Sequence, residues 1–182
     1  MHGLPLFVHH CRERDADKGP ALGAYTDLLA VLRRHPALLP ERICVHCFTG
    51  DVGDMQMLVA AGYLLGLTGA CVLQSTFSRT SHSNLAAAAA GFVAIVKRAD
   101  GTIAALQAGT LPLAQLLLET DAPFMAPDKV WLPAATGLGL GRKNEPAAMP
   151  AVCRAVAVAC GQEAEEVAAV TTANAKRFFR FE

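Results

Sequence analysis

Three short stretches of the sequence contain side chains that bind divalent metal ions or phosphate groups in proteins. They are residues 9–12 (HHCR), 45–50 (VHCFTG) and 119–123 (ETDAP). Together they offer imidazole nitrogens and carboxylate oxygens, which suit Mg²⁺, Mn²⁺ or Zn²⁺. A single histidine at the end of a strand is more often a hydrogen-bonded structural residue than a ligand. Taken together, however, the three stretches favour a metal site.

Each stretch lies at the end of a short apolar run with the character of a buried strand. Four such runs are bounded by Gly, Pro or polar turn residues, which favours strands. They are residues 4–10 (LPLFVHH), 43–48 (ICVHCF), 63–68 (YLLGLT) and 116–121 (LLLETD). Their nearly continuous apolar character is typical of strands buried on both faces.

Helices are expected between these runs. Leucines recur at helical spacing in residues 23–35, and residues 51–61 form a second short pattern with Asp51 as N-cap and Gly62 just past its end. The order strand, helix, strand, helix, strand predicts an α/β fold with a parallel sheet. In such folds the C-terminal ends of the strands lie at one edge, so the metal-type side chains are expected to meet there.

Two segments complete the predicted domain, which spans residues 1–182. Residues 71–110 contain a polar patch and then an Ala-rich stretch, and we interpret them as an inserted loop followed by one or two helices. Residues 146–182 are expected to form two helices joined near Gly161, with acidic residues in the first turn of the second helix, where the helix dipole favours them. Those residues are Glu163, Glu165 and Glu166.

The composition excludes several classes of protein. Sixteen basic residues balance 16 acidic ones, so the formal net charge is zero and any contact with nucleic acid must be local. The hydrophobic fraction is 53%, yet no uncharged apolar run reaches the ~20 residues of a membrane span. The N-terminus resembles no secretory leader, and a cytoplasmic location is expected.

The six cysteines are expected to be free thiols, because their spacing is irregular and no secretory signal is evident. Cys44 and Cys47 have the spacing of a zinc or redox pair. Side chains alternate along a strand, however, so the two sulfurs are expected on opposite faces unless the strand ends between them. We therefore interpret this pair as structural.

Several motifs together resemble the TatD family of metal-dependent deoxyribonucleases, in the same order along the chain. They are LPLFVH followed by HCRER, VHCFTG, GYLLGLTG, LLLETDAPFMAP, RKNEP and TTANAKRFF. The resemblance covers nearly the whole chain apart from residues 71–110. It implies a TIM-type (β/α)8 barrel with a divalent metal site at its C-terminal mouth and DNA as the substrate.

The resemblance also implies roles for individual residues. His46 and Asp121 match metal ligands of the family, and Asp121 is also expected to orient the attacking water. The family's pattern of His, any residue, Arg selects His10 as a further ligand, whereas counting from Leu4 selects His9. Arg12 is expected to bind phosphate, with a surface salt bridge as the alternative.

Glu119 lies on the same predicted strand face as Asp121. It is expected either to support the metal ligands through a hydrogen bond or to face a neighbour in the barrel core.

The sequence also departs from the family. The Asp-x-His-x-His motif of the first strand and the Gly-Glu strand, both of which provide ligands in the family, are absent from these residues. A complete barrel needs about 250 residues. We therefore expect the C-terminal half of a barrel, corresponding to an incomplete gene model or a fragment of an ordinary nuclease of this family, with little nuclease activity on its own.

Two alternatives to this function stay open. One is a non-catalytic relative that acts as an interaction module or self-associates through its open sheet edges. The other is an amidohydrolase-type enzyme acting on an ester or amide, because fold and ligands do not fix the substrate.

Overall fold

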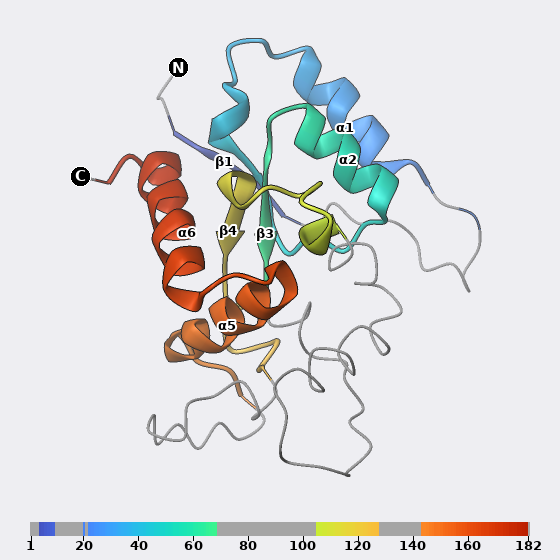
Figure 1. Cartoon of the computed structure of the whole chain (residues 1–182). Coiled ribbons are helices and arrows are strands. Elements are labelled where there is room, and N and C mark those ends of the chain that lie inside the picture. Colours follow the sequence, from blue (N-terminus) through green and yellow to red (C-terminus); the bar gives the residue numbers. More distant parts are fainter. Residues whose placement is uncertain (1–3, 10–19, 21, 69–104, 128–142, 182) are drawn as a thin grey trace.

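The computed structural model describes residues 4–9, 20, 22–68, 105–127 and 143–181. Four parallel strands alternate with helices along the chain, and two helices follow the last strand (Figure 1). The strands are β1 (Leu6–Val8), β2 (Ile43–Val45), β3 (Leu64–Leu67) and β4 (Leu116–Leu118). The α-helices are α1 (Ala24–Arg33), α2 (Val52–Ala60), α5 (Met149–Cys160) and α6 (Ala164–Phe179), and short 3-10 turns precede β2, β4 and α5.

The strands form one sheet in the order β1-β2-β3-β4, and every neighbouring pair is parallel. Phe7 pairs with Cys44, Cys44 with Leu64, and Leu65 with Leu116. The strands therefore end side by side at one edge of the sheet. The expectations of an α/β fold and a parallel sheet are confirmed, although each strand is shorter than its apolar run.

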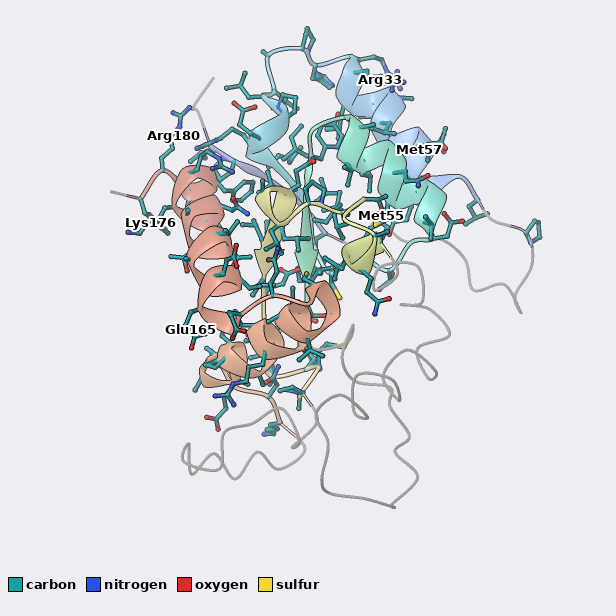
Figure 2. All side chains as sticks on the ribbon, in the orientation of Figure 1. Arg33, Met55, Met57, Glu165, Lys176 and Arg180 are labelled. Atoms are coloured by element: carbon teal, nitrogen blue, oxygen red, sulfur yellow. The ribbon has the colours of Figure 1, made fainter. Side chains whose placement is uncertain are left out.

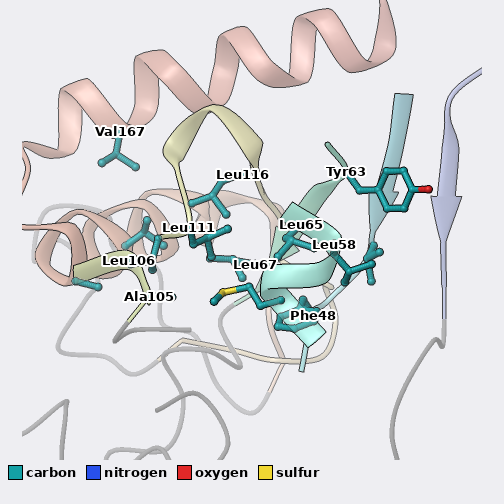
Figure 3. Packing of buried hydrophobic residues seen from close by; sticks show 14 of the residues in the cluster. Phe48, Leu58, Tyr63, Leu65, Leu67, Ala105, Leu106, Leu111, Leu116 and Val167 are labelled. Carbon is teal, nitrogen blue, oxygen red and sulfur yellow. The ribbon is translucent and has the colours of Figure 1, made fainter. Parts of the chain in front are cut away.

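One face of the sheet packs against the helices and forms the main core. Ile43, Val45, Leu65, Leu67 and Leu116 point to this face and are buried. Figure 3 shows Leu65 and Leu67 packed beside Leu58 of α2, with Val167 of α6 farther along the core. Burying a side chain of this size contributes about 1.5–3 kcal/mol, so this face supplies much of the stability.

The opposite face of the sheet carries a smaller apolar cluster. Cys44, Leu64 and Leu117 contact Phe178, which α6 inserts from its C-terminal end. Burial raises the pKa of the Cys44 thiol above its ordinary value, and the charge of Glu119 adds to the effect. Cys44 is therefore a neutral apolar group of the core, in agreement with its structural interpretation.

The ends of α2 follow directly from its sequence. The Asp51 side chain accepts a hydrogen bond from the Asp54 N–H at 2.8 Å, and Asp54 accepts one from the Asp51 N–H at 3.3 Å, which completes a capping box. Gly62 follows the helix with a φ of 82°, a conformation that favours glycine. Between these ends Met55 is fully buried while Met57 is exposed (Figure 2).

The last helix is attached to the sheet through a buried amide. Asn174 of α6 is 2% exposed, and its Nδ2 donates to the carbonyls of Leu113 at 2.7 Å and Leu116 at 2.8 Å. The Asn174 Oδ1 accepts from Arg177 at 2.9 Å. Asn174 therefore fixes α6 against the start of β4, on the left of Figure 1.

The remaining expectations concern the segments outside the strands. The two C-terminal helices are confirmed and meet at Gly161, the C-cap of α5. The expected insertion falls almost wholly outside the described residues, which omit 69–104. Among the described residues, no helix has the length and hydropathy needed to cross a bilayer.

Candidate metal centre

His46 is the first residue after β2, at the C-terminal edge of the sheet. Its backbone N–H still donates to the Val8 carbonyl at 3.0 Å, so the parallel ladder extends to this position. By alternation His46 lies on the face of Cys44, opposite the main core. Its side chain is 10% exposed, so its imidazole is largely shielded from solvent.

Glu119 contacts the backbone and a side chain of the same turn after β2. Its Oε2 lies 2.7 Å from the Nδ1 of His46, and its Oε1 accepts the backbone N–H of Cys47, also at 2.7 Å. Glu119 comes directly after β4, and its own N–H donates to the Leu67 carbonyl at 3.0 Å. Of the two orientations expected for Glu119, the structure shows the one that supports the predicted ligand His46.

Gly66 allows Glu119 to reach across β3, which separates β2 from β4. A Cβ at Gly66 would lie 2.8 Å from the Glu119 Cδ, closer than real Cβ contacts, and would overlap with Oε1. It would also lie 3.3 Å from the Cys47 nitrogen. A glycine inside an apolar strand often marks a close approach of this kind. Gly66 in the YLLGLT strand is therefore a sequence feature that could have indicated the site, although it was used only to predict a strand.

Asp121 approaches the other nitrogen of His46. Its Oδ1 lies 3.6 Å from the His46 Nε2, too far for a hydrogen bond. Two ligands of one ion at metal–ligand distances of about 2.0–2.2 Å lie about 3–3.6 Å apart. The His46 and Asp121 atoms are therefore spaced so that one small cation can contact both.

Asn144 holds the loop that carries Asp121. Its side chain is 3% exposed, and Nδ2 donates to the carbonyls of Thr120 at 2.7 Å and Met125 at 3.2 Å. Its backbone N–H donates to the Pro123 carbonyl at 2.9 Å. Asn144 belongs to the RKNEP motif, whose role in this loop sequence reasoning did not identify.

His9 is placed beside the site, whereas two other predicted residues are not described. The imidazole of His9 stacks on that of His46, with ring centroids 4.5 Å apart and planes 12° apart. His9 shares its strand face with Phe7, whose ring lies 5.3 Å from that of His46. His10 and Arg12 lie outside the described residues, so the predictions for them stay untested.

The described donors do not by themselves make a complete metal site. Across the described residues, no group of three His, Cys, Asp or Glu side chains is arranged to hold a metal ion. The Cys47 sulfur belongs to no such group and lies 3.3 Å from the Thr68 hydroxyl. The His46 nitrogen and the Asp121 oxygen suit a divalent cation in type and spacing, and further ligands must complete the coordination.

Sequence comparison connects these features to a family. The family model described as "TatD related DNase" matches residues 1–180. A Mycobacterium tuberculosis protein named "Uncharacterized metal-dependent hydrolase TatD" is 32% identical over 177 residues, covering 97% of this chain and 49% of the relative. A Musicola paradisiaca protein named "3'-5' ssDNA/RNA exonuclease TatD" is 30% identical over 178 residues, covering 98% of this chain and 52% of the relative.

Solved structures give the same result. The TatD homologue YJJV of Escherichia coli K12 is similar with a TM-score of 0.57 and 26% identity, over 87% of this chain and 47% of that one. A TatD family hydrolase from Entamoeba histolytica has a TM-score of 0.60 at 17% identity, over 86% and 48% of the two chains, which supports the fold alone. The chain spans about half the length of the curated relatives it matches. Through the match over residues 1–180, this chain belongs to the TatD-related DNase family.

Proposed function

We propose that the chain belongs to a metal-dependent hydrolase that cleaves phosphodiester bonds in DNA. The observation that carries this proposal is the 3.6 Å approach of the His46 Nε2 and the Asp121 Oδ1 at the C-terminal edge of a parallel sheet. The family match and the relatives named as single-stranded DNA and RNA exonucleases support the choice of substrate.

His46 and Asp121 hold the ion in this proposal, and Asp121 also orients the attacking water. His10 is the third ligand by its motif, and His9, stacked on His46, is the alternative. Arg12 binds a phosphate oxygen through its planar guanidinium. The chemistry supplied by a bound Mg²⁺, Mn²⁺ or Zn²⁺ is polarisation of the phosphoryl group and activation of water near neutral pH.

The wider architecture is part of the proposal. Residues 1–182 form one domain, the C-terminal half of a TIM-type barrel, with residues 71–110 as an insertion. The unbroken strand order and the helices on one face of the sheet support this arrangement. The two described ligands are fewer than a catalytic metal site needs, so the chain alone is expected to have weak activity.

A nuclease assay tests this function. A single-stranded DNA oligonucleotide labelled at its 5′ end is incubated with the purified chain and Mn²⁺, with and without a chelator, and the products are resolved by length. We expect slow hydrolysis that the chelator stops. Asp121→Ala should reduce it to background, because the variant loses an ion ligand and the group that orients water.

Asp27→Ala is the matched control, because Asp27 is an exposed carboxylate in the first turn of α1. It should keep the wild-type rate. Hydrolysis that survives both the chelator and Asp121→Ala would contradict the metal site. Comparison of His9→Ala with His10→Ala identifies the third ligand, since only the variant that removes it should lose activity.

Self-association is a second candidate role, and exposed aromatic side chains favour it. Phe7, Phe179 and Phe181 are 40%, 43% and 66% exposed, and ring contacts join them through the buried Phe178. We call these four residues the aromatic patch. Strands β1 and β4 form the two edges of the described sheet. A second copy of the chain could bury the patch and pair with an edge.

A further inference from the structure

We infer that Glu119 is a positioning residue that fixes the orientation and the tautomer of His46, with the hydrogen on Nδ1 and the Nε2 lone pair directed toward Asp121. The inference deepens the proposed function and rests on it for the identity of the bound ion. It assigns to Glu119 a role that is separate from metal ligation. The contacts of the two carboxylate oxygens carry the argument.

Both oxygens of Glu119 have fixed partners. The backbone N–H of Cys47 can only donate, so Oε1 must accept at this 2.7 Å contact. Oε2 lies 2.7 Å from the Nδ1 of His46, and a carboxylate oxygen is the acceptor in a contact of this kind. Nδ1 must therefore donate to Oε2. A neutral imidazole with its proton on Nδ1 has its lone pair on Nε2, the form that binds metal ions.

The surroundings prevent Glu119 from moving to another arrangement. Its side chain is 15% exposed, so little water competes for the oxygens. A positive φ of 45° at Cys47 accompanies the approach of its N–H to the carboxylate. Gly66 leaves the space in which the carboxylate lies, since a Cβ there would come within 2.8 Å of Cδ. Residues at β2, β3 and β4 therefore together hold the Glu119 carboxylate against the His46 imidazole.

The amide variant Glu119→Gln tests the inference, because the backbone N–H of Cys47 fixes the orientation of the amide group. The amide oxygen has to accept the Cys47 N–H, and this places the NH2 group against the Nδ1 of His46. An NH2 group only donates, so Nδ1 must become the acceptor and the proton must move to Nε2. The variant keeps the shape of the side chain but removes the lone pair that faces Asp121.

The first measurement is the tautomer of His46 in the metal-free chain, read from the ¹⁵N shifts of the imidazole nitrogens at about pH 9, above the ordinary imidazole range. We expect the proton on Nδ1 in the wild type and on Nε2 in Glu119→Gln. Glu41→Gln is the matched control, because Glu41 is exposed in the turn before β2. A wild-type protein with the proton on Nε2 would overturn the inference, and this result needs no variant to fold.

The second measurement is the affinity for Mn²⁺ alone, by calorimetric titration. Loss of a residue that orients a ligand typically weakens metal binding by about 10–100-fold, and we expect this for Glu119→Gln but not for Glu41→Gln. Wild-type affinity in a variant with an inverted tautomer would overturn the inference. If the wild type binds no Mn²⁺, the proposed function fails, while the tautomer measurement still decides the role of Glu119.

Discussion

Two residues at the site have backbone conformations that residues other than glycine rarely adopt. Cys47 has a φ of 45° and Asp121 a φ of 53°. Such conformations cost on the order of 1–3 kcal/mol each, and they occur where contacts with the surrounding structure hold the backbone in place. Here the contacts are those of Glu119 with Cys47 and of Asn144 with the loop around Asp121. The strained positions therefore coincide with the predicted ligand Asp121 and with the residue next to the predicted ligand His46.

Sequence reasoning reached His46 and Asp121, because both follow apolar strands whose ends must meet in a parallel sheet. It left Glu119 undecided, since its contact with His46 spans β3 and depends on the register of three strands. It could not separate His9 from His10, because the family's motif and the count of residues from Leu4 select different histidines. Only His9 lies among the described residues, where it stacks on His46.

Gly50 is the last residue of the VHCFTG motif, and the packing around it leaves no room for a side chain. An added Cβ would lie 2.7 Å from ring atoms of both Phe48 and Tyr25, which are buried. We expect Gly50→Ala to lower the free energy of unfolding by about 1–3 kcal/mol through overpacking, measured by urea denaturation. Gly53→Ala on α2 is the control, since its Cβ would meet only an Asp51 oxygen at 3.3 Å. Equal midpoints for the two variants would contradict this explanation.

At the scale of elements, the alternation of strands and helices was predictable, whereas the faces of the strands were not. All residues of β2 and β3 are buried, so no polar alternation distinguishes the side that faces the helices from the side that carries the site. The position of α6 depends on Asn174, a residue whose type alone does not indicate burial in a helix. Its contacts are long-range, which is why the sequence pattern could not reveal them.

The attachment of α6 gives a prediction at this scale. Asn174→Ala should lower the free energy of unfolding by about 2 kcal/mol, because the Leu113 and Leu116 carbonyls lose buried hydrogen bonds. The shift of the urea midpoint measures this loss. Thr172→Ala, at an exposed position of the same helix, should change stability by less than about 0.5 kcal/mol. A midpoint for Asn174→Ala that matches this control would show that the amide does not hold α6.

At the scale of the whole molecule, the described helices pack mainly against one face of the sheet, which holds the main core. On the other face, Phe178 and Ala175 of α6 pack against Cys44, Leu64 and Leu117. The site borders the aromatic patch on this second face, because the ring of Phe7 lies 5.3 Å from that of His46 and 6.3 Å from that of Phe178. An exposed cluster of large aromatic side chains is characteristic of a surface that contacts another molecule.

The proposed self-association can be tested by sedimentation velocity over a range of protein concentrations. We expect the mean mass to rise with concentration, because association buries the aromatic patch. Phe181→Glu should weaken this rise, since it places a charge at the most exposed ring of the patch. Val31→Glu is the control, as Val31 is 46% exposed on α1, away from the patch. A constant monomer mass at every concentration would rule out the second candidate role.

The hydrogen bonds of Asn144 also bear on how such proteins diversify. They join residue 144 to the backbone carbonyls of residues 120, 123 and 125, which belong to the loop after β4. The backbone around Asp121 is therefore held from two directions, by the end of β4 and by a residue much later in the chain. Surface residues elsewhere can differ between relatives while these bonds keep the predicted ligand Asp121 in place.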